Sequence, residues 1–284
     1  MTGREMLQYY PSCRHVLLLS LVVFPVVQLA VFSMVGGYSE RLGLLAGELT
    51  ILCVVFLSIR RHKWIAEDLL LLNATRLSVL VAAVVAGVGG SLVMAELDLL
   101  FARLVSSYGF TPSLALQRSL LELQVVSRLS DVPLALAAVV VAPGVCEEAF
   151  FRGFLLTALV VRLGPKVGLA LSALVFATVH FNPWQFPALL LFGLFLGLLT
   201  WWTHSIYPAI LAHGTNNLLS LIGTNARAYT GVDALATADY LPLPILAAAL
   251  VCLGLGLELI RRRHPLVAFA PLLQRVTATT RPEV

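Results

Sequence analysis

Charged residues are what this chain has least of. Asp, Glu, Lys and Arg make up only 12% of its 284 residues, whereas 59% are hydrophobic, and the mean hydropathy is +0.92. A soluble globular domain usually carries about twice that charged fraction, so this class is excluded. The net charge of +4 does not indicate a nucleic-acid-binding protein, because basic residues gather at the ends of apolar runs, as at Arg60, Arg61 and Lys63.

The chain also lacks any cysteine pattern. Cys13, Cys53, Cys146 and Cys252 stand far apart, without a C-x-x-C pair, so neither a disulfide framework nor a thiolate metal site is predicted. A cleavable signal peptide is not indicated either. The first apolar run, over about residues 15–35, is longer than a signal sequence needs and has no small-x-small exit. We expect it to remain as a transmembrane helix.

What the chain has in abundance is apolar runs of bilayer length. Taking about 20 apolar residues as one span predicts an all-α, polytopic transmembrane bundle of about eight helices around a polar intramembrane cavity. The predicted spans are residues 15–36, 42–59, 77–97, 132–161, 167–181, 186–203, 206–222 and 242–260. We expect a single domain over residues 1–264, followed by a short cytoplasmic tail over residues 265–284.

An even number of spans puts both termini on the same side of the membrane. Most Lys and Arg residues then fall in the inner segments, which predicts cytoplasmic termini in a prokaryotic cytoplasmic membrane. Residues 99–131 are too polar to span. Leucines at helical spacing within them predict an interfacial amphipathic helix or a lid.

Ionisable side chains inside the spans are few. Each costs on the order of 2.5 to 3.5 kcal/mol to insert, so such groups normally face a cavity or one another. Glu148 and Arg152, spaced i, i+4 in the fourth predicted span, can pair on one helix face. Glu147 is rotated by about 100° from its neighbour and is left free to act. Three other intramembrane carboxyl groups are expected to be more isolated: Glu48, Glu96 and Glu258.

Two later helices repeat the i, i+4 arrangement. Phe176 and His180 share one helix face, and His213 and Asn217 share another. Three helices could therefore direct one set of side chains to the same point: Glu147, His180, His213 and Asn217. Hydrolysis needs such groups, namely a base for water and neutral donors for an oxyanion. Any one of them could also serve as an interhelical hydrogen bond, but the combination favours a catalytic or ion-conducting site.

These residues form three motifs that resemble the signature of the CAAX protease and bacteriocin-processing family of intramembrane endopeptidases. The motifs are Glu147-Glu148-x-x-x-Arg152, Phe176-x-x-x-His180 and His213-x-x-x-Asn217. They cover about residues 130–222. The resemblance implies eight transmembrane helices around a water-filled cavity. It also implies cleavage of prenylated proteins near the C-terminus, or processing of peptides and other membrane proteins.

The same resemblance implies a role for each matched residue. Glu147 would be the general base, assisted by His180. His213 and Asn217 would form the oxyanion hole. Glu148 and Arg152 would brace the site. The expected partners are membrane lipid and a peptide or protein substrate, with or without a lipid group, and no nucleic acid.

Two alternatives stay open. A zinc-dependent hydrolase would use Glu147, His180 and His213 as ligands. The sequence has no H-E-x-x-H, and Asn217 suits an oxyanion better than zinc, so we favour a mechanism with no cofactor. A transporter, immunity factor or membrane scaffold would instead use the polar cluster for proton binding or partner contact. Such a protein has no need of an oxyanion donor.

Overall fold

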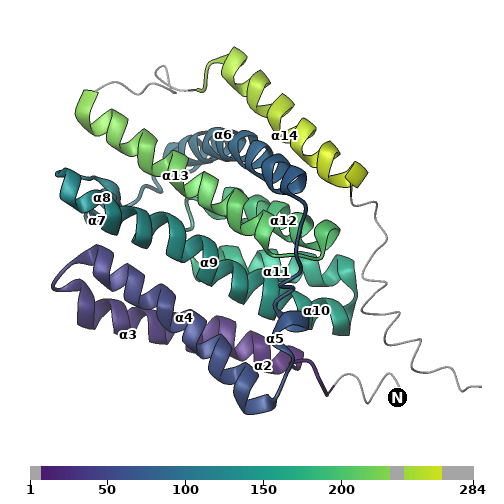
Figure 1. Cartoon of the computed structure of the whole chain (residues 1–284). Helices are drawn as coiled ribbons and strands as arrows, with labels where there is room; N and C mark the ends of the chain where they lie inside the picture. The colour runs from purple at the N-terminus through teal and green to yellow at the C-terminus, as the bar shows by residue number, and fades with distance from the viewer. Residues whose placement is uncertain (1–7, 231–239, 264–284) are drawn as a thin grey trace, which may run out of the picture.

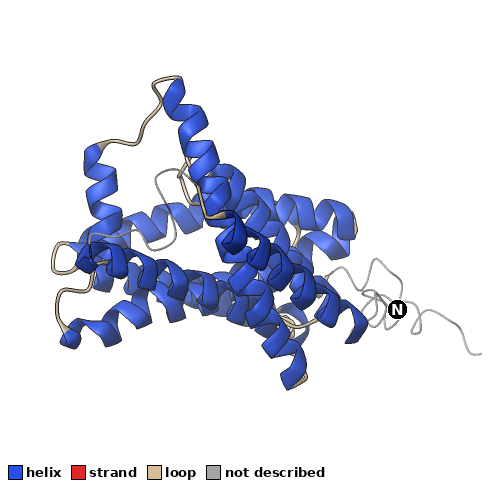
Figure 2. Ribbon diagram, turned by 90° about the horizontal axis from the view of Figure 1, so that it is seen from above, coloured by secondary structure: helices blue, strands red, loops and turns tan. Residues whose placement is uncertain are grey.

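The computed structural model describes residues 8–230 and 240–263, so the predicted tail at 265–284 lies outside the described residues. In these two ranges the chain is built from helices and has no β-strand (Figure 2). The helical elements are, in chain order, α2 (Cys13–Leu18), the π-helix η1 (Leu19–Val23), α3 (Phe24–Gly36), α4 (Glu40–His62), α5 (Ala66–Leu69), α6 (Leu77–Ser107), α7 (Leu114–Gln124), the 3-10 helix η2 (Leu129–Asp131), α8 (Val132–Ala135), the π-helix η3 (Leu136–Val141), α9 (Ala142–Glu148), the π-helix η4 (Ala149–Leu155), α10 (Leu156–Leu163), α11 (Pro165–Val179), α12 (Phe186–Thr203), α13 (Tyr207–Thr230) and α14 (Leu243–Arg263).

Helices occupy all eight ranges that were predicted as spans. Within the described part of the chain, six helical stretches are long and apolar enough to cross a membrane: Cys13–Gly36, Glu40–His62, Leu77–Ser107, Leu129–Leu163, Phe186–Thr203 and Leu243–Arg263. α11 is apolar but shorter, with 15 residues, and α13 carries polar side chains along its length. The prediction of an all-α polytopic bundle is confirmed, and the chain is an integral, multi-pass membrane protein.

The helices are arranged so that α9 lies near the middle of the bundle. Figure 1 shows α3 and α4 side by side along one edge and α14 along the opposite edge. α14 packs mainly on α6, and α6 packs on α13. α9 contacts α4 on one side and α13 on the other. The acidic residues at the end of α9 are therefore surrounded by helices from both halves of the chain.

Close approach between helices depends on glycine in α6. A Cβ added at Gly89 would lie 2.4 Å from the carbonyl oxygen of Ala249 and 2.4 Å from the amide nitrogen of Leu253, both in α14. A Cβ added at Gly87 would lie 3.0 Å from the Cα of Ala212 in α13. Small residues that let backbones approach are a usual source of helix association in lipid.

The connector between the third and fourth spans begins later than predicted. α6 continues beyond residue 99, so the prediction that all of residues 99–131 lie outside a span was wrong at its start. The polar side chains along this part of α6 have partners that allow the helix to continue. Asp98 Oδ2 accepts a hydrogen bond from Gln185 Nε2 at 3.2 Å, and the Arg103 guanidinium lies 4.3 Å from the ring centre of Tyr240. The predicted amphipathic helix is present as α7.

Candidate active site

The helix that carries Glu147 and Glu148 is flanked at both ends by segments of π-helical geometry. α9 lies between two π-helical segments, η3 and η4, and Pro143 near its start has no amide hydrogen to donate. π-helical turns are rare and frequently occur at functional sites. Glu147 and Glu148 follow one another at the end of α9 and face different neighbours. Glu147 faces α3, α4 and the end of α11, whereas Glu148 faces α13.

Glu148 lies between Arg152 and His213 in a fully buried cluster. Its Oε1 is 3.1 Å from Arg152 Nη1 and 2.8 Å from His213 Nδ1, and the three side chains are 0–5% exposed. Arg152 also lies 4.2 Å from the ring centre of Phe176 and donates to the carbonyl of Gly193 at 3.4 Å. The predicted Glu148–Arg152 pair is confirmed. The contact with His213 was not predicted, because it joins residues 65 positions apart.

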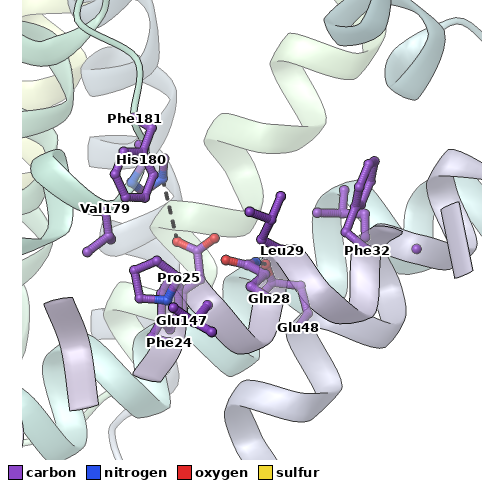
Figure 3. A pocket seen from close by; sticks show the side chains of 13 residues that line it. Phe24, Pro25, Gln28, Leu29, Phe32, Glu48, Glu147, Val179, His180 and Phe181 are labelled. Carbon is purple, nitrogen blue, oxygen red and sulfur yellow. Dashed lines mark hydrogen bonds and ion pairs between the residues drawn. The ribbon is translucent and has the colours of Figure 1, made fainter. Parts of the chain in front are cut away.

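Glu147 is held apart from this cluster and faces His180. Glu147 Oε2 lies 3.8 Å from His180 Nε2 (Figure 3), which is too long for a direct hydrogen bond. His180 caps the end of α11, and its Nδ1 lies 2.7 Å from the carbonyl oxygen of Phe176. Because a carbonyl only accepts, Nδ1 carries the hydrogen, and Nε2 of the neutral ring is an acceptor. Two acceptors at this distance suit a group that donates to both, as water does.

Two cavities meet at His180. The first, of about 620 Å³, lies between α3, α4, α9 and the end of α11, and its walls are mostly apolar. Figure 3 shows Glu147 and His180 on one side of it. The second, of about 390 Å³, has a more polar lining that includes His180, His213, Asn216, Asn217, Asp98, Gln124 and Gln185. His180 therefore forms part of the wall of both cavities.

α13 presents its polar side chains to the second cavity. Asn216 Nδ2 donates to Asn217 Oδ1 at 3.2 Å, which leaves the Asn217 amide hydrogens to point elsewhere. The structure thus brings Glu147 and His180 together, and sets His180, His213 and Asn217 around one cavity. Glu147 lines the first cavity and not the second. His180 is the residue that joins the two groups.

The residues that the zinc-dependent alternative would use as ligands are not gathered into one site. Within the described ranges, no group of three or more His, Cys, Asp or Glu side chains is arranged to bind a metal ion. Of the three candidate ligands, Glu147 faces His180, while His213 bonds to Glu148 instead.

The sequence interpretation of Glu48 as an isolated carboxyl group was wrong. Glu48, on α4, lines the same cavity as Glu147 (Figure 3). Its Oε1 accepts a hydrogen bond from Gln28 Nε2 at 3.1 Å. The signal was present, because Glu48 and Gln28 are both polar residues inside apolar runs. Nothing in the sequence, however, indicates that α3 and α4 meet α9 at this point.

Comparison with known proteins agrees with the three motifs. Residues 129–219 match the family model described as Type II CAAX prenyl endopeptidase Rce1-like. No curated protein and no solved structure gives a significant match. The matched range runs from η2 into α13 and contains every residue of the three motifs. The chain therefore carries, at residues 129–219, a domain of the Rce1-like family of CAAX-type membrane endopeptidases.

Proposed function

We propose that the protein is an intramembrane endopeptidase in which Glu147 activates the attacking water. The observation that supports this most directly is the 3.8 Å approach of Glu147 Oε2 to His180 Nε2 at the wall of a cavity. A water between these acceptors donates one hydrogen to each. Its oxygen attacks the carbonyl carbon of the scissile peptide as its proton passes to the Glu147 carboxylate. That proton is then delivered to the leaving amine.

His213 and Asn217 stabilise the oxyanion in this mechanism. His213 Nδ1 donates to Glu148, so Nε2 can donate only when the ring is an imidazolium. The buried cluster of Glu148, Arg152 and protonated His213 then carries one excess positive charge. This charge complements the negative oxygen that develops on the substrate in a low-dielectric site. Asn216 contributes by fixing the Asn217 carbonyl, which orients the amide hydrogens of Asn217.

The apolar cavity suggests the kind of substrate. Its volume of about 620 Å³ lies within the usual range for a ligand site, and its walls include Phe24, Leu29, Phe32, Val179 and Phe181. An apolar group next to the scissile bond fits these walls. We propose a membrane-associated peptide or protein whose cleaved region carries a lipid or an apolar side chain.

The test replaces the base by its neutral isostere. Glu147→Gln in purified protein should lower kcat for a quenched farnesylated reporter peptide by roughly 10²- to 10⁴-fold, the range that general-base catalysis contributes. Glu96→Gln is the matched control. Glu96 is a buried carboxyl group of α6 that lines neither cavity, so its variant should keep its activity. Turnover by Glu147→Gln at the wild-type rate would show that Glu147 is not the base.

Two further measurements separate the alternatives. Asn217→Ala should lower kcat by roughly 10²- to 10³-fold if Asn217 stabilises an oxyanion, and a transporter or scaffold predicts a mild effect. Full activity with substoichiometric zinc and in the presence of chelators supports the metal-free mechanism. Loss of activity in proportion to bound zinc supports the zinc-dependent one.

If the reporter peptide is not cleaved, the substrate can be sought in the membrane itself. Peptide termini from membranes that contain the wild type are compared by mass spectrometry with those from membranes that contain Glu147→Gln. Termini that appear only with the wild type identify both the substrate and the cleaved bond.

A further inference from the structure

Glu48 is a buried carboxyl group that none of the three motifs contains. The residue is 1% exposed and lies in the middle of α4. Oε1 accepts a hydrogen bond from the neutral amide of Gln28, whereas the buried Oε2 has no hydrogen-bond partner among the described residues. A carboxylate left in this state in an apolar environment is costly, so Glu48 requires either a proton or a further partner.

The group it can reach lies in the same cavity. Glu48 and Glu147 both line the apolar cavity, together with Gln28 and His180 (Figure 3). Glu147 Oε2 is also buried and has no hydrogen-bond partner in the described structure. Two carboxyl groups that face one low-dielectric cavity cannot both ionise without strong repulsion. Charge repulsion across the cavity therefore favours one neutral and one ionised carboxyl group.

The surroundings indicate which group keeps the proton. Glu147 is the more accessible of the two, with a side chain 12% exposed, and it faces His180. Glu48 is more deeply buried and has only a neutral amide beside it. Burial disfavours the charged form most where no cation or solvent compensates it. The proton belongs on Glu48, which turns its unpartnered oxygen into a hydrogen-bond donor.

We propose that Glu48 is a positioning residue of the active site, which in protonated form donates a hydrogen bond to Glu147, directly or through one water. This inference rests on the proposed function, because it gives Glu48 its role through the catalytic base. The bond keeps Glu147 ionised and fixes the direction of its carboxylate. Gln28 holds the other oxygen of Glu48 and so aims the donor across the cavity.

The test compares two substitutions at Glu48 with the Glu96→Gln control. Glu48→Gln keeps a donor of the same shape and should keep kcat within about threefold of the wild type. Glu48→Leu removes the donor and should lower kcat by roughly 10- to 100-fold, the value of a hydrogen bond to a charged group, with KM nearly unchanged. Wild-type kcat in a folded Glu48→Leu protein would overturn the proposal.

Infrared spectroscopy gives a readout that needs neither substrate nor the Leu variant. The wild type should show a protonated-carboxyl carbonyl band that disappears in Glu48→Gln and persists in Glu147→Gln. An unchanged band in Glu48→Gln would show that Glu48 is not the protonated group and would refute the inference. The activity of Glu147→Gln distinguishes failure of the proposed function from failure of the inference about Glu48. Its turnover at the wild-type rate would contradict the proposed function, whereas an inactive Glu147→Gln with Glu48 variants of wild-type kcat would contradict only this inference.

Discussion

Glu148→Gln is the substitution for which the structure predicts the clearest separation of stability from activity. The change removes one negative charge and leaves the shape of the side chain nearly the same. Arg152, which is 1% exposed, then remains as a buried cation without its counterion. His213 keeps a hydrogen-bond acceptor at Nδ1, because the amide oxygen of Gln can replace Oε1. The expected loss of stability therefore comes from Arg152.

The size of this stability loss depends on the contacts that Arg152 keeps in the Glu148→Gln variant. Removing one partner of a buried ion pair usually destabilises a protein by about 3 to 5 kcal/mol. Arg152 keeps the Phe176 ring at 4.2 Å and the Gly193 carbonyl at 3.4 Å, so we expect the lower end of the range. A loss of about 3 kcal/mol in the free energy of unfolding lowers the folding equilibrium constant roughly 150-fold.

A second substitution tests the cause. Arg152→Met in the Glu148→Gln background removes the unpaired cation and should restore stability to within about 1 kcal/mol of the wild type. Peptide cleavage should stay low in this double variant under the proposed mechanism, because His213 no longer has the negatively charged partner Glu148. Stability is measured by equilibrium unfolding in mixed micelles, with tryptophan fluorescence as the signal that monitors unfolding. The reasoning is refuted if Glu148→Gln alone costs under about 1 kcal/mol, or if the double variant is no more stable than it.

Three other predictions concern the scaffold. Gly89→Ala should lower the free energy of unfolding by about 1 to 3 kcal/mol, because its Cβ would lie 2.4 Å from the Ala249 oxygen, whereas Gly254→Ala, with nothing within 4 Å, should be neutral. The ring centres of Trp184 and Phe110 stack 4.9 Å apart. Trp184→Ala should therefore lower the free energy of unfolding by about 1 kcal/mol and speed protease cleavage of the connector after α6 roughly fivefold. An unchanged cleavage rate would contradict this prediction. Fluorescent reporters fused to the two termini should both report the cytoplasm, and opposite locations would disprove an even number of spans.

The helices could be located from the sequence because hydrophobic run length alone fixes where a chain can cross a bilayer. Each predicted range contains a helix, and the i, i+4 spacing correctly paired Glu148 with Arg152. Interactions within one helix depend on local spacing, so they can be derived from sequence. The end of α6 was predicted too early because it depends on a contact between residues that are distant in the sequence. Its polar residue Asp98 is accommodated by Gln185, which the chain reaches only 87 positions later.

The site was less predictable wherever it depends on contacts between helices. The bond from His213 to Glu148 and the position of Glu48 beside Glu147 both require knowing which helices are neighbours. The π-helical turns around α9 were not expected either. They change the direction of successive side chains by amounts that a regular 3.6-residue period does not describe.

The shared wall at His180 has a consequence for the design of inhibitors. An apolar fragment placed in the apolar cavity would reach Glu147 without approaching Asn217. A polar fragment in the second cavity would reach Asn217 without approaching Glu147. Neither fragment needs to compete with the other. Two weak compounds joined by a short linker past the imidazole would gain from effective concentration, so their combined affinity can exceed that of each alone by roughly 10²- to 10⁴-fold.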